Sequence, residues 1–208
     1  LPQGTITSRV HTGRSPHDAT AAGGHTFFAA NEAGRSVTVV RDGKVVHQFT
    51  DVAQPAGLAA VGDQVALVDV RQDNLHVYNS TTLRVQTTLP AGNGPTHVVA
   101  DKHGTLAVTD TRGNALLLYT LGTHPKQVGK LNLPGKPYGM TYDPVRDRVW
   151  VTLTALNQLV GIDISGSTPR VVRRIPTVRA PYTDAVDSAS GRLFVTGTRN
   201  GKLQIIDQ

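Results

Sequence analysis

Several side chains that could bind a metal ion lie shortly after prolines in this sequence. His17, Asp18, His97 and Asp184 each follow a proline by one to three residues. Imidazole and carboxylate groups are hard or borderline ligands, so the four together would suit a divalent metal ion. Such an ion would act as a Lewis acid while a carboxylate, Asp18 or Asp184, moved protons. We therefore predict these four residues as the candidates for a metal site.

Two kinds of loop supply the other candidate binding residues. Tyr138 and Tyr182 directly follow prolines and would offer aromatic surface to a ligand. A second kind of loop carries polar and charged side chains, including Arg71, Arg112 and Arg199 at similar places. The full set of predicted ligand-binding residues is His17, Asp18, Asn31, Glu32, Asp69, His97, Asp110, Arg112, Tyr138, Tyr182 and Asp184. No nucleophile motif, phosphate loop or dinucleotide fingerprint is found, so no catalytic residue is predicted.

Many of these candidates also have a structural interpretation, which we consider the stronger one. Asn31, Asp69 and Asp110 occupy one position of a repeat, where a short polar side chain can satisfy loop N–H groups. His17 and His97 follow their prolines by different numbers of residues. That difference favours packing or hydrogen bonding in the loop over metal ligation.

The candidates lie in an internal repeat of about 40 residues. Its units begin near Pro16, Pro55, Pro95, Pro137 and Pro181. In the first unit, short segments rich in apolar residues alternate with turn residues and predict strands over Asp18–Ala22, His25–Asn31, Ser36–Arg41 and Lys44–Phe49. Asp-Gly at positions 42–43, between two apolar runs, is a strong hairpin signal. No segment has the sustained apolar period of a helix.

Equivalent strands recur in the later units. The second strand is predicted at Gln64–Asp69, Thr105–Asp110, Arg148–Thr154 and Arg192–Thr198. The third is predicted at Asn74–Tyr78, Asn114–Tyr119, Gln158–Asp163 and Lys202–Asp207. Alternation along the second strands predicts a core that contains Val65, Leu67, Leu106, Val108, Val149, Val151, Leu193 and Val195.

Four short antiparallel strands in every repeat are the signature of a β-propeller. We predict an all-β fold over residues 1–208, a single domain with about five four-stranded blades and almost no helix. The last unit ends after its third strand, and Gly4–Val10 has the alternating pattern of an outer strand. We expect this N-terminal strand to pair with Lys202–Asp207 and close the ring, because an open strand edge invites aggregation.

Composition excludes several classes of protein. With 38% hydrophobic residues and 21 glycines the chain can bury a core, and no apolar run approaches the roughly 18 residues of a membrane helix. The absence of cysteine excludes disulfides and thiolate metal sites, and it fits an exported bacterial protein. The net charge of +6 comes from scattered basic residues, and aromatic residues are too few for base stacking, so nucleic acid is not the expected partner.

The repeats resemble those of the YVTN-type β-propeller family of bacterial surface-layer-like and periplasmic proteins. The resemblance is carried by GRSPHDATAAGGHTFFAANEAGRSVTVV, NQLVGID and GKLQIID, and it covers essentially the whole chain. It implies a β-propeller, commonly of about seven blades in this family, outside the cytoplasm. The family has no shared catalytic motif, so the resemblance implies no reaction.

Two enzyme families are similar to the sequence locally. Pro16-His17 and residues 27–32 look comparable to strands of streptogramin lyases, but the paired His-x-Glu-x-His-type catalytic segment is missing. Asn31 and Asp110 resemble two axial residues of gluconolactonase-type metal-dependent lactonases, whose surrounding motifs are also missing. Neither resemblance therefore carries a catalytic site onto this chain.

These observations favour a non-enzymatic binding or scaffold protein that is secreted, periplasmic or at the cell surface. We expect a monomer that holds a protein or small-molecule ligand on one loop face around the central axis. No cofactor is evident, although the residues after the prolines would allow a divalent metal ion on the axis. The alternative is a metal-assisted lactonase or lyase with its site on the axis.

Overall fold

The computed structural model describes residues 4, 6, 8–166 and 168–208, which form five antiparallel sheets and no helix. The first sheet contains β1 (Pro16–Ala21), β2 (Thr26–Asn31), β3 (Ser36–Arg41) and β4 (Lys44–Phe49). The second contains β5 (Pro55–Val61), β6 (Gln64–Asp69), β7 (Asn74–Asn79) and β8 (Arg84–Pro90). The third contains β9 (Pro95–Ala100), β10 (Thr105–Asp110), β11 (Ala115–Thr120) and β12 (Lys126–Asn132). The fourth contains β13 (Pro137–Asp143), β14 (Arg148–Leu153), β15 (Gln158–Asp163) and β16 (Arg170–Pro176), and the fifth β17 (Pro181–Val186), β18 (Leu193–Gly197) and β19 (Lys202–Ile206).

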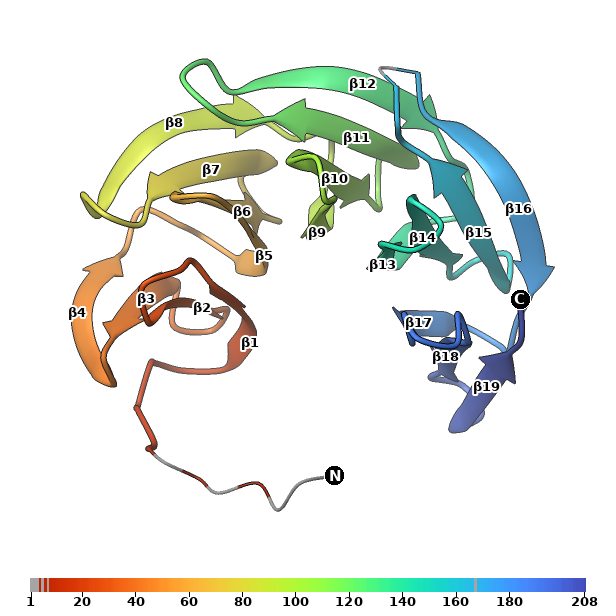
Figure 1. The fold of residues 1–208 in the computed structure, drawn as a ribbon, viewed down its shortest axis with the longest axis horizontal. Helices are drawn as coiled ribbons and strands as arrows, with labels where there is room; N and C mark the ends of the chain where they lie inside the picture. Colours follow the sequence, from red (N-terminus) through yellow and green to blue (C-terminus); the bar gives the residue numbers. More distant parts are fainter. Residues whose placement is uncertain (1–3, 5, 7, 167) are drawn as a thin grey trace.

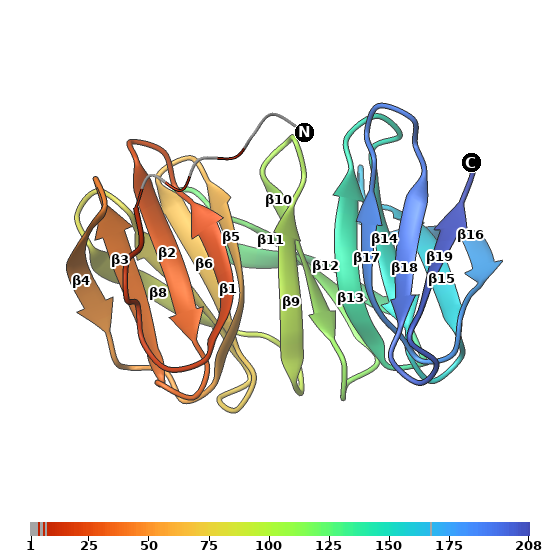
Figure 2. The ribbon, with the colours of Figure 1, turned by 90° about the horizontal axis from the view of Figure 1, so that it is seen from below.

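The sheets stand side by side in an arc around a central axis (Figure 1). The first strand of each sheet lies nearest the axis, and consecutive inner strands β1, β5, β9, β13 and β17 pack against one another. The view from below shows that the strands run roughly along the axis, so their turns gather at the two faces of the arc, one at each end of the axis (Figure 2). The predicted all-β architecture is thus confirmed, as are the strands predicted within the five repeats, with ends that differ by up to two residues.

Apolar layers between consecutive sheets form the core. Phe28 and Leu67 lie between the first and second sheets, and Trp150 and Val195 lie between the fourth and fifth. All eight side chains predicted for the core from the second strands are fully buried: Val65, Leu67, Leu106, Val108, Val149, Val151, Leu193 and Val195. Because successive side chains of a strand point to opposite faces, each central sheet contributes to two layers.

The predicted four-stranded fifth blade and the predicted ring closure are not confirmed. In the described part of the chain the fifth sheet has three strands, in the order β17-β18-β19. Of the predicted closing strand Gly4–Val10, Thr5 and Thr7 lie outside the described residues, and residues 8–10 belong to no strand. Closure of the ring by this segment therefore stays a prediction.

The chain just before β1 contacts the first sheet. The carbonyl oxygen of Thr12 accepts hydrogen bonds from Asn31 Nδ2 at 3.1 Å and from Thr38 Oγ1 at 2.6 Å. Both donors are buried side chains, of β2 and β3, so these hydrogen bonds connect the segment before β1 to the first sheet. The first sheet is therefore where the described residues anchor this segment.

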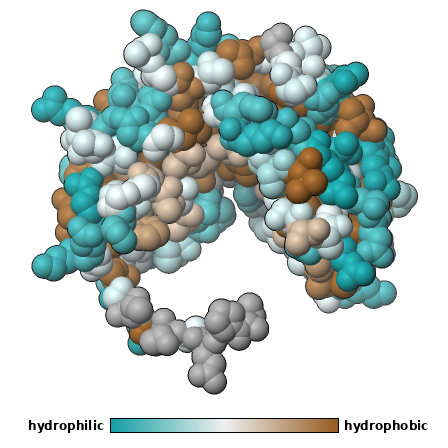
Figure 3. Space-filling view, in the orientation of Figure 1, coloured by the Kyte–Doolittle hydropathy of each residue, from teal (hydrophilic) through white to brown (hydrophobic). Residues whose placement is uncertain are grey.

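Hydrophilic residues predominate on the rim of the arc, with hydrophobic residues scattered among them (Figure 3). The described residues include no helix that is long and apolar enough to cross a membrane.

Candidate functional site

One of the two faces of the arc, which we call the loop face, carries the starts of the inner strands and the turns between second and third strands. Each inner strand begins at a proline, and a register shift follows at each of them: Pro16, Pro55, Pro95, Pro137 and Pro181. Such bulges turn the side chains near them out of the regular strand pattern. The residues immediately after the prolines are therefore displayed near the axis.

Four ring side chains from four inner strands form a continuous series, which we call the aromatic row. The His17 and His97 rings lie 6.2 Å apart, and the His97 and Tyr138 rings 4.7 Å apart in an edge-to-face arrangement. The Tyr138 and Tyr182 rings lie 4.3 Å apart, and their hydroxyl groups share a hydrogen bond of 2.6 Å. Four predicted site residues, His17, His97, Tyr138 and Tyr182, are thus brought together.

Burial sets the protonation of the central members of this row. Burial, with a smaller contribution from His17, lowers the pKa of His97 to about 4, so this imidazole is neutral near pH 7. Burial raises the pKa of Tyr138, as do its hydrogen bond with Tyr182 and the nearby Glu32 carboxylate. Tyr138 therefore keeps its phenolic proton, and the middle of the row is uncharged.

A hollow of about 210 Å³ opens beside the aromatic row, and we call it the axial pocket. It is lined by His17, Glu32, Gln54, Ala56, Val70, Thr96 and Tyr138. The Gln54 amide donates a hydrogen bond of 2.9 Å to Glu32 Oε1, which fixes both side chains across the first and second sheets. A neighbouring hollow of about 260 Å³ shares Glu32 and Gln54 and is also lined by Arg35 and Arg71.

Besides the apolar Ala56 and Val70, two polar residues of the axial pocket, Gln54 and Thr96, were not predicted from the sequence. Both adjoin the repeated prolines, so their place in the repeat was a signal that could have identified them. The Thr96 hydroxyl lies 2.7 Å from that of Thr111, which donates to the carbonyl of Pro137. This chain of hydrogen bonds holds the start of β13 in place and thereby positions Tyr138.

Three predicted site residues, Asn31, Asp69 and Asp110, do not line the axial pocket, and two of them cap loops. Asp69 Oδ1 accepts hydrogen bonds from the N–H groups of Gln54, Arg71 and Gln72. Asp110 Oδ1 accepts one from Gly113 N–H at 2.9 Å. All three residues are buried, and the structure agrees with the capping interpretation for Asp69 and Asp110. Asn31 differs, because its Oδ1 accepts no hydrogen bond within the described residues, and its Nδ2 donates to the Thr12 carbonyl, Ser36 Oγ and Thr38 Oγ1.

The remaining candidates lie apart from the axial pocket. Asp18 accepts hydrogen bonds from the N–H groups of Ala19 and Leu58, which connect the first and second sheets. Arg112 donates to the carbonyl of Val70 and to Asp73 Oδ1.

Asp184 lies between the fourth and fifth sheets and not at the loop face. It pairs in register with Val195, and both its carboxylate oxygens are buried without a hydrogen-bond partner among the described residues. Burial raises the pKa of this carboxyl well above its ordinary value. The described residues contain no group of three or more His, Asp or Glu side chains that could hold a metal ion. The four predicted metal ligands are therefore not gathered into one site.

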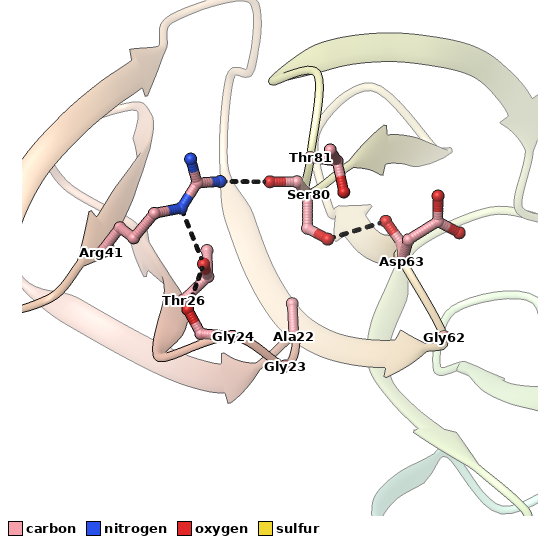
Figure 4. Close-up of a pocket in the computed structure, with 9 residues that line it drawn as sticks. All are labelled: Ala22, Gly23, Gly24, Thr26, Arg41, Gly62, Asp63, Ser80 and Thr81. Carbon is pink, nitrogen blue, oxygen red and sulfur yellow. Dashed lines mark hydrogen bonds between the residues drawn. The ribbon is translucent and has the colours of Figure 1, made fainter.

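A further hollow, of about 340 Å³, lies at the opposite end of the first and second sheets (Figure 4). Its arginine, Arg41, donates from Nε to Thr26 Oγ1 at 3.0 Å and from Nη2 to the Ser80 carbonyl at 2.6 Å. The bond to Ser80, which follows β7, connects the two sheets, whereas the bond to Thr26 lies within the first sheet. We therefore interpret this hollow as a packing feature of the interface.

Solved structures establish the type of fold. The chain is similar to a functionally unknown protein from Desulfotomaculum acetoxidans, with 13% identity and a TM-score of 0.79 over 97% of this chain and 72% of that one. It is also similar to a catalytically inactive virginiamycin B lyase from Staphylococcus aureus bound to quinupristin, with 16% identity and a TM-score of 0.77 over 99% and 75%. A putative 6-phosphogluconolactonase from Bacteroides uniformis has 12% identity and a TM-score of 0.74 over 90% and 65%.

The fold is of the β-propeller type. At identities this low the likeness concerns the fold alone, because one fold supports many activities. No protein-family model matches this sequence, and no curated protein sequence matches it.

Proposed function

We propose that this protein is a non-enzymatic binding protein of the YVTN-repeat type that acts as a monomer outside the cytoplasm. The observation that carries the proposal is the aromatic row beside the axial pocket. Two rings of the row, those of His17 and Tyr138, line a hollow that also contains a carboxylate, an amide and a hydroxyl group. Aromatic surface combined with a few fixed polar groups is typical of a ligand site.

The site is rigid and partly accessible. Tyr182 is 46% exposed at one end of the row, so a ligand can reach ring surface there. The hydrogen bond between the Tyr138 and Tyr182 hydroxyl groups and the one from the Gln54 amide to the Glu32 carboxylate hold these side chains before any ligand arrives. Such preorganisation lowers the entropic cost of binding.

The titratable groups around the axial pocket favour binding over catalysis. His97 has a pKa of about 4, which makes it a weak general base near pH 7. Asp69 and Asp110, the carboxylates that follow the second strands, are occupied by loop N–H groups. The proposed ligand is therefore held without a reaction, on ring surface and by hydrogen bonds.

Ligand-observed NMR with a panel of saccharides, peptides and nucleosides tests this function. We expect at least one class to bind, and the double variant His17→Ala with Tyr138→Ala to weaken binding about tenfold or more. His124→Ala, an exposed histidine away from the aromatic row, is the control and should leave binding unchanged. A panel in which nothing binds, or equal binding by the double variant, contradicts the proposal.

The alternative, a metal-assisted lactonase or lyase, stays a prediction. Two structures of similar fold are described as a lyase and a putative lactonase, but the described residues here gather no metal-binding group. Elemental analysis after dialysis, with thermal melts with and without chelator, distinguishes the two functions. Metal retained by the protein together with a lower melting temperature in chelator would favour the enzyme, because metal bound to the native state stabilises it.

A further inference from the structure

An arginine recurs in the turn between the second and third strands of three sheets. It follows by two residues the second-strand residue that pairs with the proline of the inner strand. Arg71, Arg112 and Arg199 occupy this position in the second, third and fifth sheets. Each lies at the cleft toward the preceding sheet, where Arg71 and Arg199 line hollows and Arg112 forms hydrogen bonds. The repeat thus offers an internal comparison of how one arginine is neutralised.

In the cleft between the second and third sheets, the chain itself supplies the counter-charge. Arg112 Nη2 lies 2.9 Å from Asp73 Oδ1 and 3.1 Å from the carbonyl oxygen of Val70. Asp73 has a positive φ of 57° and directly precedes β7. An acidic residue at this turn position therefore satisfies the arginine of the next sheet.

The cleft between the fourth and fifth sheets lacks that carboxylate. Asn157, with a φ of 54°, directly precedes β15 and occupies the position of Asp73. A hollow of about 230 Å³ is lined there by Thr154, Ala155, Asn157, Arg179, Ala180 and Arg199. This lining contains no carboxylate and adds a second arginine, Arg179. Within the described part of the chain, neither arginine forms an ion pair.

We propose that this fourth–fifth cleft binds a tetrahedral oxyanion of the phosphate or sulfate type. A guanidinium group presents a planar set of N–H donors that matches two oxygens of such an anion. Two arginine side chains line this one small hollow, so an anion bound there is attracted by both positive charges. Asn157 offers no negative charge, and its Oδ1 already accepts a hydrogen bond of 2.8 Å from Ala180 N–H. The proposed anion neutralises Arg199 as the Asp73 carboxylate neutralises Arg112.

This site is independent of the axial pocket, with which it shares no lining residue. It borders the exposed end of the aromatic row, because Ala180 and Tyr182 flank Pro181. Its function can therefore be tested without knowing the ligand of the axial pocket.

Titration with inorganic phosphate at constant ionic strength tests the proposal. We follow the arginine Nε–H signals by NMR and expect saturable shifts of Arg179 and Arg199. Arg199→Gln should weaken phosphate binding about tenfold, because a charge-assisted contact is lost. Asn157→Asp should weaken it by a similar factor of about ten without removing a cation, because the new carboxylate pairs with Arg199 as Asp73 pairs with Arg112.

Arg173→Gln is the matched control, since it removes an exposed arginine from the outer strand β16. It should leave phosphate affinity unchanged. Sulfate should bind as phosphate does, and saturable binding of both supports the site. Shifts that grow linearly with phosphate, binding of acetate alone, or unchanged affinity in Arg199→Gln or Asn157→Asp would each overturn the proposal.

Discussion

The third and fifth sheets are two units of the same repeat, yet their inner strands bury different side chains. Three residues after its proline, β9 has Val98, which pairs with Val108 inside an apolar layer. At the same position β17 has Asp184, which pairs with Val195 and is also buried. One residue earlier, the third sheet has the half-buried His97 and the fifth has the exposed Thr183.

This difference shows that the register of the repeat decides burial, whatever the residue type. The equivalent residues Leu58 and Met140 are buried too, because this position of β5, β9, β13 and β17 faces the preceding sheet. The equivalent residue of β1, Ala19, is exposed, since no sheet precedes the first one in the described arc. An aspartate at such a position becomes buried with its strand, and its carboxyl responds by a raised pKa. The third and fifth sheets thus each contain a titratable group, His97 and Asp184. Stability falls on acidification because of His97 and falls as the pH rises because of Asp184.

The largest expected effect is a loss of stability on acidification because of His97. Its folded-state pKa of about 4 lies below the ordinary value of 6.5, so the unfolded state binds the proton more readily. The free energy of unfolding should therefore fall by about 3 kcal/mol between pH 6.5 and 4. Urea denaturation across this range measures the fall, and His97→Thr, which copies Thr183, should remove most of it. An unchanged pH slope in His97→Thr would show that another group is responsible.

Next in size, Asp184→Val should stabilise the protein at pH 7 by about 2 kcal/mol, because it removes a buried polar group without a partner. A carboxyl with a raised folded-state pKa contributes stability that is fully present below its ordinary pKa and is lost as the pH rises. The gain from the substitution should therefore be larger at pH 7 than at pH 4. Denaturation of both proteins at the two pH values measures this difference, and an equal gain at both would exclude ionisation as the cause.

A smaller effect is expected at the turn after β10. Asp110 caps this turn through Gly113 N–H, whereas the fifth sheet has Gly197 at the equivalent position. Asp110→Ala should cost about 1 kcal/mol of unfolding free energy and speed hydrogen exchange at Gly113. Asp110→Asn, which keeps an acceptor oxygen, should cost less. Equal costs for the two variants would contradict the capping role.

The smallest expected effect on stability is that of Asp73→Asn, which gives the second–third cleft the neutral side chain of the fourth–fifth cleft. The Arg112 ion pair is exposed, so the unfolding free energy should change by no more than about 0.5 kcal/mol. Phosphate should then shift the Arg112 side-chain signal in NMR, which it should not do in the unchanged protein. A variant whose Arg112 signal ignores phosphate would show that a second arginine is needed.

The amino-acid sequence by itself determined the strands, their order within each sheet and the core. Alternating apolar residues and turn residues act over a few positions, so they predicted β6 and β10 to the residue and all eight core side chains. The repeat of the prolines also identified the loop face and most of the aromatic row. His17, His97, Tyr138 and Tyr182 could be predicted because each lies within two residues of a proline.

Only the tertiary structure decided which side chains meet across neighbouring sheets. Glu32 contacts Gln54 and Arg112 contacts Asp73 over long separations in the chain, and no local pattern encodes these pairs. Asp184 was expected at the loop face but is buried one layer away, since the bulge after Pro181 and the packing of the fifth sheet on the fourth set its direction. Local sterics select strands and turns, whereas partners, burial and pKa depend on how separately formed sheets pack together.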